Sequence, residues 1–283
     1  MSSPQVWFIT GSSSGFGRAV AEHVLRKGDI AVATLRTPSA LADLAARYPP
    51  SRLLVLPLDV TDAAQIQAAF ARALEVFGRI DVVWNNAGYT MLGEAEGTPD
   101  EVARKMFEVN FWGAANVSRE AVRVFRDVNS PRGGRLLQNS SVAGLQGYLL
   151  IAYYSATKFA LEGLTESLVA EIPPEWNIKI TLVEPGSFNT SALDNGVKLP
   201  QHPAYATPDS ASTAFRKAVE TFEMPGDPEK GAERIYELAA LPNPPLHLVL
   251  GADAVLTARK KAADLAREVE EYASWSDGTA TVH

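Results

Sequence analysis

The sequence predicts an α/β fold: a doubly wound, Rossmann-like parallel sheet of about seven strands, with helices on both faces. Two observations predict it. Short apolar runs alternate with amphipathic segments, and the 283-residue length suits one large domain. Continuous apolar runs are typical of strands buried on both faces. Their alternation with helices gives parallel strands joined by right-handed crossovers.

Seven apolar runs are expected to form the strands: 6–10, 30–35, 53–58, 80–85, 135–139, 179–183 and 246–250. Apolar residues from Ile66 to Phe77 recur at helical spacing. Thr98 resembles a helix cap, because Pro99 follows it and Glu101 lies three residues on. A last helix is expected at about 252–272.

A proline-containing stretch at about 187–228 breaks this alternation directly after a strand. One helix is predicted inside it, from about Asp209 to Phe222. Ligands of such sheets bind at the carboxyl ends of the strands, which favours a substrate lid over a surface insertion. We therefore expect a single domain over residues 1–283 that includes this lid.

Composition excludes several classes of function. The net charge of -7, without any basic block, argues against nucleic acid and anionic membranes as partners. The absence of cysteine excludes disulfides and thiolate sites and fits a cytoplasmic location. No apolar run is long enough to predict a membrane span. No metal site is predicted, because no ligand spacing links the four histidines, His23, His202, His247 and His283.

A glycine-rich loop follows the first predicted strand and precedes a helix. Glycines let the backbone turn tightly and approach a pyrophosphate, and the helix N-terminus attracts its charge. The context of strand, loop and helix favours a dinucleotide site over an ordinary turn. The loop residues expected to contact the cofactor are Gly11, Ser13, Ser14, Gly15, Phe16 and Gly17.

The end of the second strand indicates which dinucleotide is preferred. NAD-binding proteins usually have an acidic residue there for the ribose 2′-hydroxyl, whereas this chain has Arg36. A guanidinium pairs well with a 2′-phosphate, so NADP(H) is preferred and NAD(H) is possible. The alternative is that Arg36 is only a solvated surface residue.

Tyr154 and Lys158 are four residues apart within a helical pattern, so their side chains share one face. A free phenol has a pKa near 10, and a neighbouring cation lowers it toward the range of a useful acid or base. Taken alone, this spacing also arises by chance on helices.

Five motifs in order resemble the short-chain dehydrogenase/reductase family, over nearly the whole chain. They are Thr10–Gly17, Asn85–Gly88, Asn110, Ser140-Ser141 with Tyr154 and Lys158, and Pro185-Gly186 with Thr190. The resemblance implies hydride transfer between a nicotinamide and a carbonyl or alcohol. Phe16 and the uncharged Ser14 depart from the usual glycine motif, and Ser14 lacks one frequent marker of NADP use.

The resemblance also implies a role for each motif residue. Tyr154 would be the general acid/base, Lys158 would bind the nicotinamide ribose and depress the tyrosine pKa, and Ser141 would hold the substrate oxygen. Asn110 would support a proton-relay water. Further cofactor contacts would come from Asp59, Val60, Asn86, Ala87, Gly88, Pro185, Gly186 and Thr190. Alternatively, Ser141 only caps a turn and Asn110 only bends its helix.

Three segments are expected to face the reacting atoms, namely 89–92, 145–151 and 188–205. Their apolar residues favour a lipophilic or aromatic ketone, aldehyde or alcohol, unless they only pack the core or a subunit contact. Ser141, Tyr148, Tyr154 and Phe188 are the expected substrate contacts. The apolar residues are Tyr89, Met91, Leu92, Leu145, Tyr148, Leu149, Leu150, Phe188, Leu193, Leu199 and Tyr205.

Family resemblance also implies a homodimer or homotetramer, to which Leu161, Leu164 and Leu168 would contribute unless they face the sheet. Two other functions fit the same fold: a nicotinamide-binding sensor or scaffold without catalysis, and a lyase. The sensor class usually loses the tyrosine or the lysine, and both are present here. A halide-releasing lyase would lack Gly15, Gly17 and Lys158.

Overall fold

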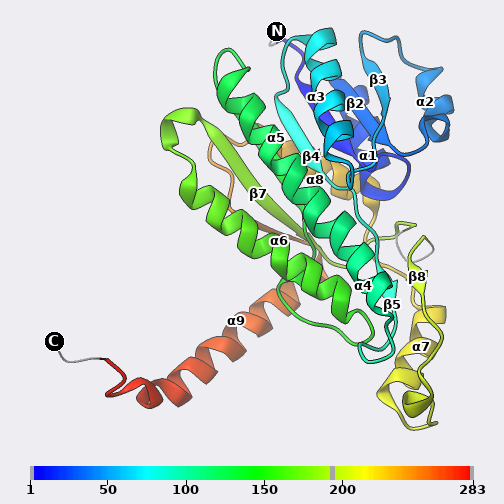
Figure 1. Ribbon diagram of the computed structural model, residues 1–283, viewed down its shortest axis with the longest axis vertical. Coiled ribbons are helices and arrows are strands. Elements are labelled where there is room, and N and C mark those ends of the chain that lie inside the picture. The colour runs from blue at the N-terminus through cyan, green and yellow to red at the C-terminus, as the bar shows by residue number, and fades with distance from the viewer. Residues whose placement is uncertain (1–2, 192–194, 281–283) are drawn as a thin grey trace.

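A seven-stranded parallel sheet forms the centre of the computed structural model, which describes residues 3–191 and 195–280 (Figure 1). The strand order is β3-β2-β1-β4-β6-β7-β9. This confirms the predicted fold, and the ends of the seven predicted strands are correct to within two residues. The strands are β1 (Val6–Thr10), β2 (Ile30–Leu35), β3 (Leu53–Pro57), β4 (Val82–Asn85), β6 (Gly134–Asn139), β7 (Ile178–Pro185) and β9 (His247–Leu250).

Helices cover both faces of the sheet. One apolar cluster joins the sheet to α1 and α8, and a second joins it to α3 and α5. No helix in residues 3–191 and 195–280 is long and apolar enough to cross a membrane. The helices are α1 (Gly15–Lys27), α2 (Ala42–Ala45), α3 (Ala63–Phe77), α4 (Asp100–Phe107), α5 (Ala114–Asp127), α6 (Ala152–Glu171), α7 (Ala211–Thr221), α8 (Pro228–Ala240) and α9 (Ala252–Tyr272).

Two details differ from the sequence expectations. Helix α4 begins at Asp100 with Pro99 as its cap, so the prediction of Thr98 was wrong by one residue. The Thr98 hydroxyl instead donates to the carbonyl of Glu94. Strands β5 (Met91–Leu92) and β8 (Val197–Lys198) pair in parallel outside the main sheet, and were not predicted. A strand of two residues is too short to show the alternation of apolar and polar residues that predicts strands.

The order of the strands predicts a crevice at the carboxyl ends of β1 and β4. The chain moves outward from β1 to β2 and β3, then returns to continue on the other side through β4. At such a reversal the connecting loops diverge, which leaves a crevice at the carboxyl ends of the strands. The motif residues lie on the loops around this edge.

Candidate active site

The loop between β1 and α1 packs closely against the end of β4. Gly11 has a φ of +68°, and a Cβ on it would lie 2.9 Å from the Cα of Ala87. A Cβ on Gly17 would lie 2.1 Å from the carbonyl oxygen of Gly11. These contacts hold the N-terminus of α1 at the crevice, which suits the binding of a pyrophosphate.

Asn86 joins three strands beneath this loop. The Thr10 hydroxyl accepts hydrogen bonds from the backbone N–H groups of Asn86 and Ala87, at 2.8 and 2.9 Å. The Asn86 side chain donates to the carbonyl of Thr10 and accepts from Asn139, both at 2.8 Å. The Asn86–Gly88 motif thus fixes the ends of β1, β4 and β6 relative to one another.

Arg36 is an exposed cation at the carboxyl end of β2. It makes no hydrogen bond or ion pair with any described residue. Asp29, at the other end of this strand, accepts from Gln5 N and from the Tyr236 hydroxyl, so its carboxylate has a structural role. Arg36 is therefore the charged group that this strand presents at the crevice edge.

Asp59 and Val60 follow β3 on the same side. One Asp59 carboxylate oxygen accepts from both the N–H and the hydroxyl of Thr61. Val60 is buried against Gly113, where a Cβ would lie 2.7 Å from a methyl carbon of Val60. Asp59 orders its turn, and Val60 ties that turn to the central helical segment.

Lys158 is buried, and its ammonium donates to the carbonyl of Asn139 at 2.6 Å. It lies 5.6 Å from the ring centroid of Tyr154. Burial lowers the pKa of Lys158 to about 8, although the negative charge of Glu162 opposes this. The lysine therefore stays mainly protonated at neutral pH.

Burial raises the pKa of Tyr154, and the hydrogen bond with Ser141 only partly offsets it. The lowering effect expected from Lys158 does not dominate the pKa of Tyr154. The phenol therefore keeps its proton at neutral pH and can act as a proton donor.

Ser141 has two roles in the structure. Its hydroxyl accepts a hydrogen bond from Ala143 N at 3.1 Å and caps the short 3-10 helix Val142–Gly144. This agrees with the alternative that Ser141 caps a turn. The same hydroxyl interacts with Tyr154. The turn fixes the Ser141 side chain beside the phenol, where both can reach one substrate oxygen.

Asn110 lies in a π-helical turn, Glu108–Gly113, that joins α4 to α5. Its side chain accepts from Tyr89 N at 3.0 Å and donates to Tyr89 O at 2.8 Å. It also lies 3.3 Å from the hydroxyl of Thr157, on α6 beside Lys158. Asn110 therefore connects the loop after β4 to the helix that carries Tyr154 and Lys158.

The chain leaving β7 packs against the start of α9. A Cβ on Gly186 would lie 2.3 Å from a carboxylate oxygen of Asp253, and Ser187 N donates to that carboxylate at 2.7 Å. Thr190 lies near the glycine-rich loop, since a Cβ on Gly15 would be 3.4 Å from it. Sequence reasoning missed Asp253, because its partner lies 66 positions away in the chain.

The predicted substrate contacts occupy different environments. Tyr148 is half-buried, and its hydroxyl lies 3.4 Å from that of Thr257 on α9. Phe188 packs into the core, with its ring centroid 4.9 Å from that of Phe16. This gives Phe188 a structural role, and its contact with substrate stays a prediction. Leu193 lies outside the described residues.

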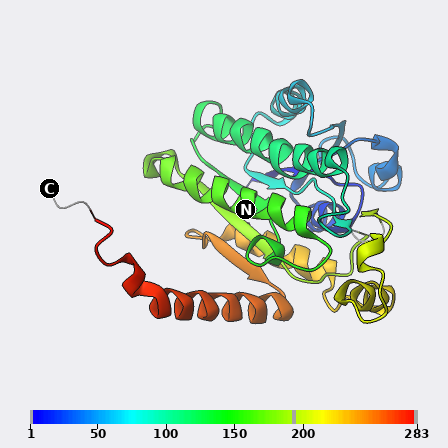
Figure 2. The same cartoon turned by 60° about the horizontal axis from the view of Figure 1, so that its bottom comes forward.

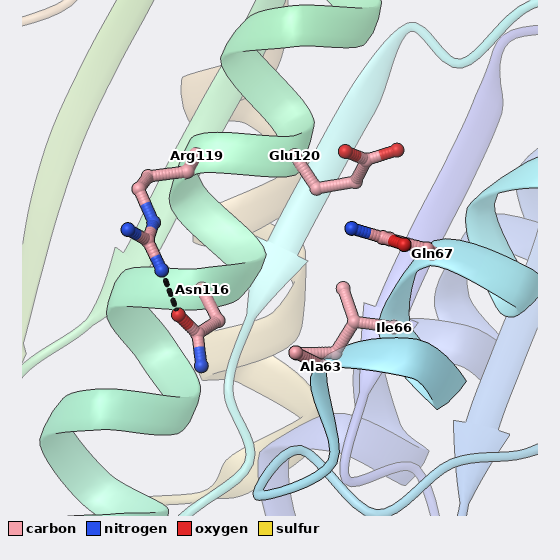
Figure 3. Close-up of a pocket in the computed structure, with 6 residues that line it drawn as sticks. All are labelled: Ala63, Ile66, Gln67, Asn116, Arg119 and Glu120. Atoms are coloured by element: carbon pink, nitrogen blue, oxygen red, sulfur yellow. Dashed lines mark hydrogen bonds between the residues drawn. The ribbon is translucent and has the colours of Figure 1, made fainter.

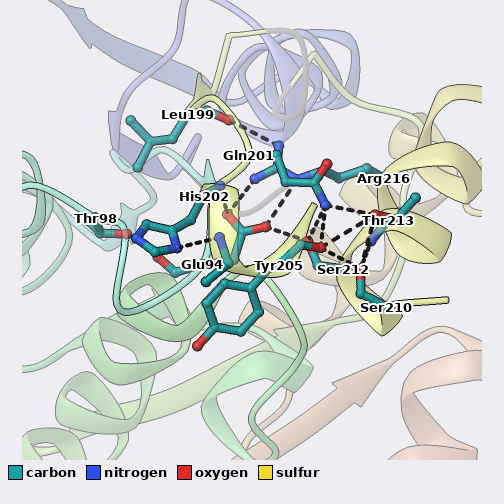
Figure 4. Close-up of polar contacts among 11 residues, drawn as sticks. Glu94, Thr98, Leu199, Gln201, His202, Tyr205, Ser210, Ser212, Thr213 and Arg216 are labelled. Atoms are coloured by element: carbon teal, nitrogen blue, oxygen red, sulfur yellow. Dashed lines mark hydrogen bonds and ion pairs between the residues drawn. The ribbon is translucent and has the colours of Figure 1, made fainter. Parts of the chain in front are cut away.

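A polar network joins the predicted lid, residues 187–228, to the segment after β5 (Figure 4). The buried Glu94 accepts from Arg216 at 2.8 Å and from the hydroxyl of Ser212, both on α7. Arg216 also donates to the carbonyl of Leu199 at 3.0 Å. Burial alone would raise the pKa of Glu94, but the bonds from Arg216 and Ser212 outweigh it and lower the pKa to about 2.

Two buried carboxylates and a histidine lie one helical turn beyond Lys158. Glu162 and Glu184 are buried, and His247 Nδ1 is 2.6 Å from Glu184. Burial raises the pKa of Glu184 and raises that of Glu162 to about 7. Among the residues that the structure describes, these three side chains form a group whose oxygen and nitrogen atoms could hold a metal ion. The 2.6 Å separation is that of a hydrogen bond and fits a shared proton.

A separate surface hollow lies between α3 and α5 (Figure 3). None of the predicted site residues lines it. Its lining residues are Ala63, Ile66, Gln67, Asn116, Arg119 and Glu120.

Comparison with known proteins identifies the family. The family model described as short chain dehydrogenase matches residues 5–198. The chain belongs to the short-chain dehydrogenase/reductase family. An uncharacterized oxidoreductase of Schizosaccharomyces pombe is 39% identical over 273 residues, covering 96% of this chain and 90% of that protein. A 3-ketodihydrosphingosine reductase of Bacteroides thetaiotaomicron is 33% identical, covering 88% of each chain.

The fold agrees with solved members of this family. A short-chain dehydrogenase from Streptomyces avermitilis has a TM-score of 0.88 and 37% identity, covering 99% of this chain and 100% of that one. Other structures with this fold are described in complex with NAD, NADH or NADP. The chain is therefore an oxidoreductase of a family whose members bind NAD or NADP and act on alcohol or carbonyl groups.

Proposed function

We propose that this dehydrogenase uses NADP(H) to reduce a lipophilic or aromatic ketone or aldehyde. The observation that carries the proposal is the arrangement of Ser141, Tyr154 and Lys158. A turn fixes the Ser141 hydroxyl, and burial keeps the Tyr154 phenol protonated. The carbonyl of Asn139 holds the Lys158 ammonium over the tyrosine ring. Together they suit a site where a carbonyl oxygen accepts a proton.

Each residue has a defined part in this reaction. The bound nicotinamide supplies the hydride to the carbonyl carbon. The Ser141 hydroxyl donates a hydrogen bond to the carbonyl oxygen, and the Tyr154 phenol transfers its proton to that oxygen as negative charge develops. The positive charge of Lys158 stabilises the phenolate that remains, until a proton from solvent restores the phenol.

Arg36 supports the preference for NADP(H). It is exposed at the carboxyl end of β2 and has no partner among the described residues, so it can pair with a 2′-phosphate. We expect Arg36→Leu to reduce kcat/KM with NADPH about tenfold or more, the effect of losing one charged contact. The value with NADH should change little. Arg47→Leu, at another exposed arginine, serves as the control.

Two observations support a lipophilic substrate. The relative from Bacteroides thetaiotaomicron is named for a long-chain ketone, and it is similar over most of both chains. The segments 145–151 and 188–205, which are expected to face the reacting atoms, contain leucine and tyrosine residues. In this proposal residues 187–228 form the lid that covers the apolar part of the substrate.

The decisive experiment follows nicotinamide absorbance with NADPH or NADH and a panel of long-chain and aromatic ketones and aldehydes. Tyr154→Phe should lower kcat by about 10²- to 10⁴-fold, the range for general acid catalysis. Tyr153→Phe, at the adjacent tyrosine, should retain activity. Normal activity in Tyr154→Phe would refute the proposed mechanism. Binding of both cofactors without turnover of any substrate would favour a sensor.

A further inference from the structure

Helix α9 leaves the body of the molecule and extends into solvent (Figures 1 and 2). Its first turn is held, because Ala254 is fully buried and Asp253 accepts from Ser187. From Lys260 to its end, every residue except Asp264 is exposed. A helix of 21 residues is about 31 Å long, so most of it has no partner in this chain.

The projecting helix carries an apolar seam. Its members follow spacings of three and four residues in alternation, which is the heptad pattern of paired helices. The side chains of Leu265, Val269 and Tyr272 are 56%, 58% and 53% exposed. The apolar face of a surface helix normally packs against the core of its own domain, and this one does not. The seam consists of Val255, Ala258, Ala262, Leu265, Val269 and Tyr272.

Three charged residues lie beside the seam. Arg259 and Lys261 are basic and lie in the first half of α9, and Glu268 is acidic and lies in the second half. An antiparallel pair would place Lys261 of each copy beside Glu268 of the other, which is favourable, whereas a parallel pair would not bring these opposite charges together.

We propose that α9 pairs antiparallel with the α9 of a second copy of this chain. The two seams then match throughout: Ala262 lies opposite Leu265, Ala258 opposite Val269, and Val255 opposite Tyr272. Each layer combines a small residue with a larger one, so the helices can approach closely. In the same register Lys261 lies near Glu268 of the second copy. This inference does not depend on the proposed reaction.

The charge pattern favours a second copy over a lipid surface. Helices that lie on membranes usually carry a basic polar face, which anionic lipids attract. The acidic second half of α9 would be repelled from such lipids, yet it contains Val269 and Tyr272, two of the largest seam residues. Alanines at two seam positions also suit close helix packing better than insertion into lipid.

The first test measures the mass of the full-length protein in solution by analytical ultracentrifugation. We expect Leu265→Asp to form smaller assemblies than the wild type, because a charge in the seam would be buried without a partner. Ala263→Asp places the same charge on an exposed residue outside the seam and should leave the assembly intact. Circular dichroism of each variant checks that the body stays folded.

Single cysteines define the direction of pairing, since the chain has no cysteine of its own. Under mild oxidation Ala258→Cys and Val269→Cys should each stay uncrosslinked, whereas the variant carrying both should give a covalent dimer. The two positions lie about 16 Å apart along one helix, too far for a bond within a chain. Crosslinking of either single variant alone would indicate parallel pairing and overturn the proposal.

Charge reversal separates pairing from simple loss of helix. Lys261→Glu should weaken dimerisation several-fold, and the combined K261E/E268K variant should restore it. A wild type that stays monomeric at high micromolar concentration would overturn the proposal. So would a dimer that Leu265→Asp leaves unchanged. Binding of the monomer to phosphatidylserine vesicles, lost in Leu265→Asp, would assign the seam to a lipid surface instead.

Discussion

The two sides of the crevice are held in different ways. On the predicted cofactor side, the β1–α1 loop meets the main chain at the end of β4, where a Cβ on Gly11 would lie 2.9 Å from the Cα of Ala87. On the lid side, the segment after β5 and α7 meet through charged and hydroxyl side chains around Glu94. The first arrangement fixes one geometry. The second is made of contacts that can separate and form again.

The largest expected effect comes from placing one methyl group in the tightly packed side. In Gly17→Ala the new Cβ would lie 2.1 Å from the Gly11 carbonyl oxygen, so α1 must move away from the loop. We expect a loss of about 3 kcal/mol in the free energy of unfolding, near the upper end for overpacking. Cofactor binding should weaken as well. Urea unfolding and cofactor fluorescence titration measure the two effects.

Gly163→Ala is the matched control for that variant. Position 163 is exposed within α6, and a Cβ there would meet nothing within 4 Å. Alanine is the better helix former, so stability should rise by up to about 1 kcal/mol. Equal destabilisation by the two variants would show that the tight contact at Gly17 has no special importance.

A smaller effect is expected on the lid side. Glu94→Gln leaves the mostly buried Arg216 without its counter-charge, which should cost about 2 kcal/mol after allowance for partial exposure. Because the pKa of Glu94 lies near 2, the wild type should lose this stabilisation only as pH falls from about 4.5 through 2. Glu94→Gln should not show this loss of stability at low pH. Urea unfolding at several pH values measures it.

Proteolysis locates the effect of the same variant. If Glu94 holds the predicted lid, cleavage within residues 187–228 should accelerate in Glu94→Gln and stay unchanged in Glu101→Gln. Glu101 is exposed, and its side chain makes no hydrogen bond or ion pair with any described residue. Faster cleavage elsewhere would place the role of Glu94 outside the lid.

The smallest expected effect concerns Glu162. Its pKa is raised to about 7, so the folded protein holds a proton there that the unfolded chain releases near pH 4.5. Stability should therefore fall as pH rises from about 4.5 to 7. Glu162→Gln should flatten this dependence, whereas Glu166→Gln, at an exposed residue of α6, should not. An unchanged slope in Glu162→Gln would place the bound proton on another group, such as Glu184.

Local sequence patterns predicted the parts of the molecule that local structure determines. Continuous apolar runs marked the strands of the main sheet, and the glycines of the first loop occupy the close contacts that require them. The Tyr154 and Lys158 spacing placed both side chains on one helix face. Each of these features depends on neighbours within a few residues, or on a burial pattern visible in a single segment.

Contacts between distant segments escaped prediction. Glu94 meets Arg216 across 122 positions, and Glu184 meets His247 across 63. Nothing in the residues beside Glu94 marks it as buried, since an acidic residue is usually solvated. The alternative that Asn110 bends its helix pointed to the right position, but the π-helical form of the turn was not predicted, because a single altered hydrogen-bond register leaves the apolar pattern of a helix almost unchanged.

Asp253 gives the C-terminal segment a share in the active site. A Cβ on Gly186 would lie 2.3 Å from one carboxylate oxygen of Asp253, and the other oxygen accepts a hydrogen bond from Ser187 N. Gly186 and Ser187 lie where the chain leaves β7 for the predicted lid. The sheet ends at Leu250, but the first turn of α9 still contacts the segment predicted to bind the nicotinamide. Removal of the chain from Asp253 onward would therefore take away a hydrogen bond of that segment together with the projecting helix.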